Sequence, residues 1–260
     1  MTASAVPNPF CSHYLVHTYE VDAGGRLRPV ALLNYLQDIA GSHAAALGFS
    51  VAQMQQRQVT WVLSRYHLHI DRYPRLGEEV EIRTWPSSRQ HLFALRDFEV
   101  CDRLGVPLVS ATSAWALIGL ESRRPVRLAE HLSDYPLVDR RAIEDNFAAL
   151  PLPAQVDLEL PFRVRYGDLD LNGHVNNTVY ADWALETVPG EVARHWLPES
   201  IEIGFRAEAF YGDRVLVRTQ TLEQGDRAVF LHQLVSDTDG RELTRLRSVW
   251  CPAPDREEDP

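Results

Sequence analysis

The sequence predicts an α+β protein made of two copies of one unit, each a strand, a helix and a run of antiparallel strands. Placing Gly77 opposite Gly212 aligns 77–115 with 212–250 without a gap and gives ten identities in 39 positions. Ordinary residue frequencies give roughly one identity in fifteen by chance, so the chain contains a structural repeat. In each half, a helical apolar stripe precedes strand-like runs that are broken by turn residues.

The first unit begins with a β-branched and aromatic run from Tyr14 to Val21, which predicts a strand. A helix is predicted over 30–47, because Pro29 suits its first turn and large apolar residues recur on one face, at Leu32, Leu33, Leu36 and Ile39. A short helix is expected within 48–58. Further strands are expected at 60–71, 78–85, 93–101 and 107–120.

The second unit centres on 164–188. Val175, Val179 and Trp183 recur at helical spacing, which predicts a helix beginning just past Gly173. Polar side chains spaced by two precede it, and in an extended segment they would share one face: Asp168, Asp170, Asn172 and His174. A helix N-terminus adds unpaired N–H groups and positive partial charge. These are the groups needed to hydrolyse an acyl bond with water.

The repeat separates scaffold from chemistry in this region. The best alignment of the two halves around their helices gives three pairs, Asp22 with Asp170, Gly24 with Asn172, and Arg26 with His174. The first copy has the acid but lacks the amide and the imidazole, which predicts one chemical site per chain, in the second half. A structural alternative stays open, because Asp and Asn before a helix commonly cap it and a single His there is commonly structural.

A family resemblance rests on the run from Asp170 to Asn177, Asp-Leu-Asn-Gly-His-Val-Asn-Asn, and on Tyr180, Trp183, Glu186 and Val188-Pro189 after it. This run resembles the central motif of the acyl-acyl carrier protein (acyl-ACP) thioesterases. Five N-terminal segments are similar to bacterial members of that family, at 25–29, 33–38, 60–65, 84–86 and 123–127. The resemblance covers most of 14–250. It implies a tandem (double) hot-dog fold, with two antiparallel sheets each wrapped on one long helix and joined as a pseudo-dimer.

The resemblance also sets the expected domains. They are an N-terminal hot-dog at 1–130, a linker at 131–157, a catalytic C-terminal hot-dog at 158–252 and a tail at 253–260. The N-terminal hot-dog lacks the catalytic Asn and His and is expected to shape the acyl pocket. The candidate pocket residues are the helix face of Leu32, Leu33, Leu36 and Ile39, for which a plain core stripe is the structural alternative.

The implied reaction is hydrolysis of fatty acyl-ACP thioesters to free fatty acid and carrier. Glu208 takes the position of a further family acid on the strand after the helix, although by pattern alone it also fits the solvent face of that strand. Ala209 stands where plant members carry a cysteine, so the resemblance implies attack by water. Either Glu208 or His174 is the expected general base.

The remaining implied roles concern positioning and charge. Asp170 is expected to orient Asn172 or His174, and Asn172 to position water or substrate. The backbone N–H groups of Val175 and Asn176 are expected to stabilise the oxyanion, because negative charge develops on the carbonyl oxygen during the reaction.

The implied partner is acyl carrier protein with its acyl-phosphopantetheine. The net charge of −10 would repel an acidic carrier, so docking requires a local basic patch, for which we expect Arg123, Arg124 and Arg127. A solvated turn is the alternative for these arginines.

Two other functions stay open, hydrolysis of acyl-coenzyme A at the same site and non-catalytic acyl binding by a hot-dog sensor.

Composition excludes several other classes. The negative net charge argues against nucleic-acid and anionic-membrane surfaces, and no apolar run approaches the ~20 residues of a membrane helix. Widely spaced cysteines, Cys11, Cys101 and Cys251, and the lack of a secretion signal predict a cytoplasmic protein with free thiols. No cofactor motif occurs, and the pair His67 and His69 lacks further ligands, so no metal is expected. A homodimer is left open.

Overall fold

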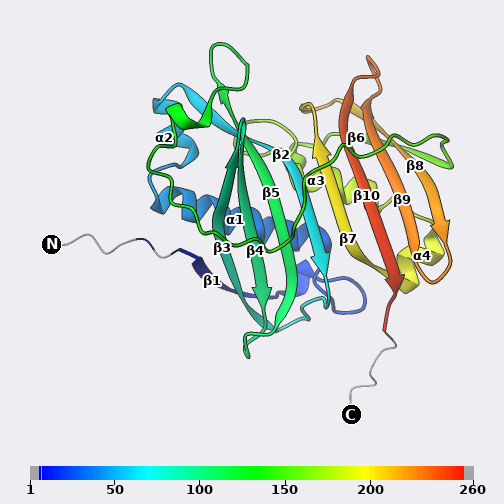
Figure 1. The fold of residues 1–260 in the computed structure, drawn as a ribbon. Helices are drawn as coiled ribbons and strands as arrows, with labels where there is room; N and C mark the ends of the chain where they lie inside the picture. The colour runs from blue at the N-terminus through cyan, green and yellow to red at the C-terminus, as the bar shows by residue number, and fades with distance from the viewer. Residues whose placement is uncertain (1–5, 7, 255–260) are drawn as a thin grey trace. The chain divides into compact units, whose positions relative to one another are not determined.

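The computed structural model describes Val6 and residues 8–254, and it divides the chain into two compact units (Figure 1). Unit 1 extends to Ala148 and unit 2 begins at Ala149. Of the predicted tail, residues 255–260 lie outside the described residues. None of the helices described is long and apolar enough to cross a membrane.

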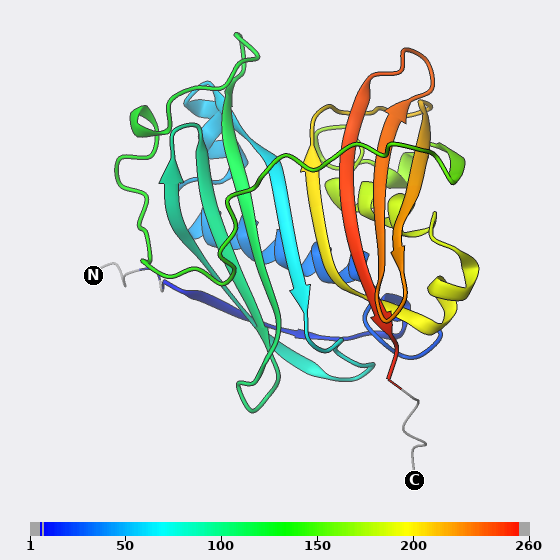
Figure 2. The same ribbon diagram turned by 45° about the vertical axis from the view of Figure 1, so that its right-hand side comes forward.

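Unit 1 contains a five-stranded antiparallel sheet in the order β1-β3-β4-β5-β2. The strands are β1 (Phe10–Leu15), β2 (Val59–Ile70), β3 (Glu79–Gln90), β4 (Phe93–Cys101) and β5 (Pro107–Gly119). The helices are α1 (Pro29–Ala46) and α2 (Val51–Gln56), with 3-10 turns η1 (Thr18–Glu20) and η2 (Leu128–Glu130). Figure 2 shows α1 lying across one face of this sheet, where its apolar stripe is buried.

Unit 2 repeats this topology, with its sheet in the order β6-β8-β9-β10-β7. The strands are β6 (Leu158–Arg163), β7 (Trp196–Phe205), β8 (Arg214–Gln224), β9 (Ala228–Ser236) and β10 (Glu242–Pro252). The helices are α3 (Asn177–Leu185) and α4 (Gly190–His195), with one 3-10 turn, η3 (Tyr166–Asp168). The predicted succession of strand, helix and antiparallel strands is therefore confirmed in both halves.

The predicted boundaries differ from the structure at two strands. The first strand is shifted from 14–21 to β1, because β1 pairs with β3 only until Leu15 lies opposite Glu79, where β3 begins. The strand predicted to end at Trp85 continues to Gln90, with a bulge between Pro86 and Ser88. Proline lacks the N–H that a regular ladder needs, and the bulge accommodates it.

The prediction of one long helix in each half is wrong for unit 2. Helix α1 has 18 residues, whereas α3 has nine and begins only at Asn177, about one helical turn beyond Gly173. Pro189 limits how far α3 could extend, because Val188 before it disfavours helical backbone. The helix ends three residues before Val188, at Leu185. The chain restarts as the short α4 with Pro189 as its N-cap.

The core of unit 2 contains a completely buried histidine. His232 Nδ1 lies 2.8 Å from the Thr219 hydroxyl, and its Nε2 lies 3.0 Å from the Ser248 hydroxyl. Trp250 Nε1–H donates to the same Ser248 oxygen at 2.9 Å. Burial lowers the pKa of His232 to about 3, so the imidazole is neutral near pH 7.

We expect unit 2 to lose stability in mild acid because of His232. An unfolded histidine titrates near pH 6.5, so between about pH 6.5 and 3 the unfolded state binds more protons than the folded state. The free energy of unfolding should therefore decrease as the pH is lowered through that window. At pH 5 this group should have reduced it by about 2 kcal/mol relative to neutral pH. Urea unfolding at pH 7.5 and 5, for the parent and for His232→Gln, measures this effect. An identical pH dependence in both proteins would contradict it.

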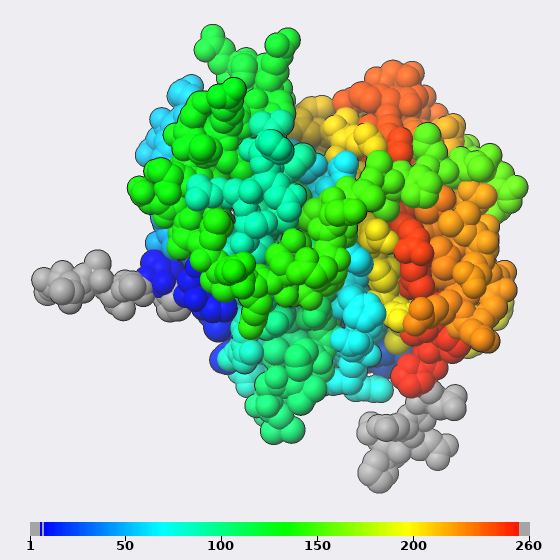
Figure 3. Space-filling view, in the orientation of Figure 1, coloured from blue at the N-terminus to red at the C-terminus, as the bar shows by residue number. Residues whose placement is uncertain are grey.

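The predicted linker at 131–157 is largely packed against the units. Residues 138–147 run along the face of the first sheet opposite α1 and are drawn in green across it in Figures 2 and 3. Val138 N–H donates to the Pro86 carbonyl at 2.9 Å, and Trp85 Nε1–H donates to the Arg140 carbonyl at 2.8 Å. On unit 2, Arg245 donates to the Leu150 carbonyl at 2.8 Å. We call residues 138–147 the strap.

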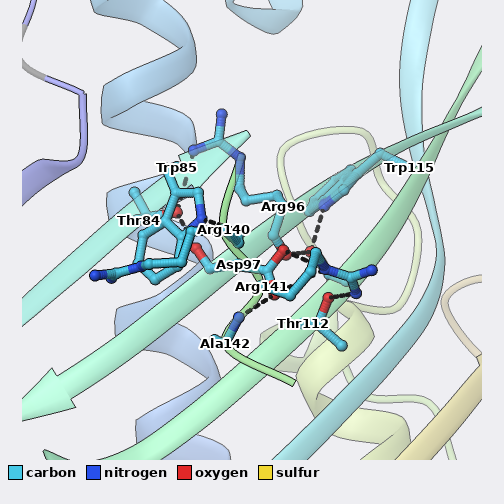
Figure 4. Close-up of polar contacts among 10 residues, drawn as sticks. Thr84, Trp85, Arg96, Asp97, Thr112, Trp115, Arg140, Arg141 and Ala142 are labelled. Atoms are coloured by element: carbon cyan, nitrogen blue, oxygen red, sulfur yellow. Dashed lines mark hydrogen bonds and ion pairs between the residues drawn. The ribbon is translucent and has the colours of Figure 1, made fainter. Parts of the chain in front are cut away.

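The strap is held by a buried carboxylate, as Figure 4 shows. Asp97 is 0% exposed and accepts from Arg141 Nε at 3.1 Å and from the Ala142 N–H at 3.0 Å. Arg141 also donates to the Thr112 hydroxyl at 2.9 Å. Arg140 lies over the Trp85 ring, 4.0 Å from its centroid. The strap therefore belongs to the folded structure of unit 1.

Candidate active site

The polar motif of unit 2 lies in the loop between β6 and α3, and the loop of unit 1 that aligns with it has the same backbone. Asp170 N–H donates to the His174 carbonyl at 2.8 Å. In unit 1, Asp22 N–H donates to the Arg26 carbonyl, also at 2.8 Å. Each loop turns at a glycine with positive φ, 77° at Gly173 and 72° at its counterpart, a conformation that glycine adopts without strain.

The aspartate carboxylates shape both loops. Asp170 Oδ1 accepts from the N–H groups of Asn172, at 2.8 Å, and His174, at 3.3 Å. Asp22 Oδ1 accepts from the equivalent two N–H groups, at 2.8 and 2.9 Å. Because Asp22 has no amide or imidazole beside it, this aspartate role is structural in origin. In unit 2, Asp170 Oδ2 also accepts from Asn172 Nδ2 at 3.4 Å. This is the contact expected if Asp170 orients Asn172.

The two loops differ in the side chains that they present. In unit 1 the Arg26 side chain folds back over the loop, with Nε 3.3 Å from Asp22 Oδ2. A Cβ atom at Gly24 would lie 2.4 Å from Arg26 Nη2, so an asparagine does not fit there while the arginine keeps this position. In unit 2, Asn172 is exposed and His174 is half-buried. The polar groups suited to chemistry are therefore confined to one copy.

His174 contacts the predicted acid. Its Nδ1 lies 3.3 Å from Glu208 Oε1, and the two side chains are 26% and 40% exposed. The ring of Phe210 meets the imidazole edge-on, with centroids 5.1 Å apart. Glu208 lies beyond β7, which ends at Phe205, so the predicted placement on that strand is wrong. A carboxylate beside an imidazole, both reached by solvent, is a pair able to take a proton from water.

Tyr180 holds the segment that carries Glu208, a role the sequence did not reveal. The Ala209 N–H donates to the Tyr180 hydroxyl at 3.0 Å, and the Val175 N–H donates to the Ala209 carbonyl at 3.0 Å. These bonds tie Glu208 to α3 and to the loop. In the sequence, Tyr180 is indistinguishable from a core residue of the helical stripe.

The two predicted oxyanion donors are wrong. The Val175 N–H is bound to the Ala209 carbonyl, and the Asn176 N–H donates to the Asp168 carbonyl at 2.8 Å. Both groups precede α3, because the helix begins at Asn177 with the Asn176 side chain as its cap. The donors counted as free in the predicted helix are therefore used to fix the loop.

The extended arrangement of the four polar residues is also wrong. Asp168 is 3% exposed and turns to Arg165, accepting from its N–H at 2.7 Å and from its guanidinium Nη2 at 2.7 Å. It closes the 3-10 turn η3 and does not join the others. Asp170 reaches the Asn172 side chain and the His174 N–H because of the tight turn at Gly173, not because alternate residues share a face.

The other predicted residues lie in unit 1. Leu32, Leu36 and Ile39 are 0% exposed and Leu33 is 3% exposed, as a core stripe or a closed acyl pocket would be.

The docking candidates Arg123, Arg124 and Arg127 are exposed on the segment after β5. His67 and His69 contact different carboxylates, those of Asp145 and Asp71. The described residues contain no group of three or more His, Cys, Asp or Glu that could hold a metal ion.

A five-stranded antiparallel sheet packed on a helix, present twice in one chain, defines the tandem hot-dog class. A model of the acyl-ACP thioesterase N-terminal domain matches residues 7–135, and one of the acyl-ACP thioesterase C-terminal domain matches residues 153–252. The chain belongs to the acyl-ACP thioesterase family, whose members are hydrolases. The family, fold and enzyme class expected from the sequence are thereby confirmed.

Named relatives agree with this assignment. Oleoyl-acyl carrier protein thioesterase 1, chloroplastic, of Arabidopsis thaliana is 28% identical over 275 residues, which cover 93% of this chain and 75% of the relative. The structure of an acyl-ACP thioesterase from Bacteroides thetaiotaomicron VPI-5482 has a TM-score of 0.83 at 28% identity, covering 92% of this chain and 96% of that one. For the 12:0-ACP thioesterase from Umbellularia californica, the TM-score is 0.85 at 26% identity, covering 94% of each chain.

Proposed function

We propose that the protein hydrolyses fatty acyl-ACP thioesters with water at the loop of unit 2. The observation that carries this proposal is the contact of His174 with Glu208. His174 and Asn172 belong to one loop, and the loop of unit 1 with the same backbone hydrogen bonds carries neither residue. The family supports the thioester substrate. The cytoplasm stays the predicted compartment.

The chemical step uses the pair as a base. Water attacks the thioester carbonyl carbon while its proton passes to the His174–Glu208 pair, and the carbonyl oxygen becomes an oxyanion. The oxyanion then collapses, the C–S bond breaks, and the sulfur leaves and takes a proton to become the carrier thiol. Proton transfer of this kind contributes typically 10²–10⁴-fold to the rate.

Asn172 takes the place of the rejected backbone donors in this proposal. Its Nδ2 has two hydrogens, of which one is directed at Asp170 Oδ2, 3.4 Å away. The other is available to the oxyanion or to the attacking water. A fixed donor at the oxyanion is worth about 3 kcal/mol in the transition state. Asp170 then acts as a positioning residue, because it touches Asn172 rather than the substrate.

The experiment that tests the function is release of free fatty acid by the purified protein. Acyl-ACP and acyl-coenzyme A of equal chain lengths should be compared, with kcat/KM measured for each. We expect faster turnover on acyl-ACP. Faster turnover on acyl-coenzyme A would favour that rival substrate, and tight acyl binding without thiol release would establish a sensor instead.

We further propose that Arg123, Arg124 and Arg127 dock the acidic carrier. Charge reversal by Arg123→Glu with Arg124→Glu should raise KM for acyl-ACP at least about fivefold and leave KM for acyl-coenzyme A within about twofold, because only the carrier presents an extended acidic surface. Arg103→Glu, at another exposed arginine of unit 1, is the matched control. An equal change in KM for both substrates would remove the docking proposal.

A further inference from the structure

Phe210 packs on the loop of unit 2 that carries Asn172 and His174, which we call the reactive loop. The Phe210 ring lies 5.1 Å from the His174 ring, centroid to centroid, and the two ring planes are 88° apart. The backbones of the two residues also form an antiparallel β-bridge. Phe210 is nevertheless 45% exposed, so burial in the core does not account for an aromatic side chain at this position.

Unit 1 shows that the fold does not require this ring. Its loop contains the equivalent antiparallel β-bridge, and the two residues that form it are Arg26 and Arg75. At Arg75 and at Phe210 alike, the backbone N–H donates to a carboxylate three residues later in the chain, in each case at 2.9 Å. The two units therefore keep one backbone arrangement and differ in both of the side chains that face each other across the bridge.

The imidazole needs support beyond its contact with Glu208. Its Nδ1 lies 3.3 Å from Glu208 Oε1, and both side chains are partly exposed. Pairs that water reaches are weak, and exposed side chains exchange rotamers within picoseconds to nanoseconds, so this contact alone does not fix the ring. A general base acts only in those molecules in which its free nitrogen faces the attacking water. Restricting the ring to that orientation raises their fraction.

We infer that Phe210 is a positioning residue, which holds the His174 imidazole with Nδ1 directed at Glu208 and Nε2 directed at the water. Glu208 and Phe210 lie two residues apart in one segment, and both contact the same ring. The carboxylate attracts one edge of the imidazole, and the phenyl ring occupies space that other rotamers of the imidazole would need. This inference rests on the proposed function, because it concerns the base of that reaction.

Steady-state kinetics with acyl-ACP tests the inference. We expect Phe210→Ala to lower kcat about tenfold and to leave KM within about twofold, because the ring acts on the base and not on the substrate. Phe210→Tyr keeps the ring and should retain kcat within about twofold. Tyr211→Ala is the matched control and should do the same, since its ring is 62% exposed in the same segment but packs on Tyr166. Phe210→Leu, with a loss of about threefold, serves if Phe210→Ala does not fold.

NMR relaxation of the His174 ring C–H groups, assigned with His174→Gln, measures the orientation of the imidazole without turnover. The order parameter of the ring should fall below about 0.6, the range of flexible groups, in Phe210→Ala and stay near the parent value in Phe210→Tyr and Tyr211→Ala. An unchanged order parameter in Phe210→Ala, or a higher KM with unchanged kcat, would overturn the inference. Absence of acyl-ACP hydrolysis by the parent, with the order parameter falling as expected, would count against the proposed function alone.

Discussion

His174→Ala is expected to lower kcat for acyl-ACP hydrolysis by about 10²–10⁴-fold and to leave the melting temperature close to that of the parent. The imidazole lies 3.3 Å from Glu208 and its side chain is 26% exposed, so its loss removes the proton-accepting His174–Glu208 pair but little packing. Steady-state kinetics with thermal unfolding of the same sample measures both quantities.

Arg26→Ala is the matched control, because Arg26 occupies the equivalent place in the loop of unit 1. We expect its kcat to stay within about threefold of the parent. Similar losses in the two variants would refute the assignment of a single reactive loop. For Asn172→Ala, kcat should fall at least about tenfold if the amide positions the oxyanion or water.

Asp97→Ala is expected to destabilise unit 1 by about 3–5 kcal/mol, the order of cost of removing one member of a buried ion pair. The substitution leaves the Arg141 guanidinium, whose side chain is 15% exposed, without its buried partner and leaves the Ala142 N–H unpaired. Urea unfolding measures the change, and limited proteolysis should cut the strap faster in the variant.

Glu99→Gln is the control for the strap, because Glu99 holds Arg140 at a more exposed pair. Exposed pairs contribute about 0–1 kcal/mol, so the control should remain close to the parent. A loss below about 1 kcal/mol in Asp97→Ala, with unchanged proteolysis, would show that the strap is not held by this carboxylate.

The repeat and the hydrophobic spacing allowed the sequence to predict the fold. Local periodicity placed α1 and most strands, since burial on one face dictates it. The pairing of Asp22 with Asp170 was equally informative, because the alignment that pairs these residues also matches the hydrogen bonds of the two loops. Comparing the copies then isolated Asn172 and His174 as the side chains that unit 1 lacks.

The features of the site that the sequence did not predict depend on tertiary contacts. Whether the Val175 N–H is free depends on the Ala209 carbonyl, which lies beyond α3, α4 and β7 in the chain. The contact of His174 with Glu208 and the burial of Asp97 beneath the strap likewise join distant segments. Residue spacing carries no record of such contacts, so the sequence identified residue types more reliably than roles.

Converting the reactive loop into its counterpart tests the central claim most directly. The double variant Asn172→Gly with His174→Arg gives unit 2 the residues that unit 1 carries over Asp22, where the arginine and the glycine fit together. We predict a folded protein with a melting temperature near that of the parent and fatty acid release from acyl-ACP lowered at least about 10²-fold. Release within about threefold of the parent would contradict the account.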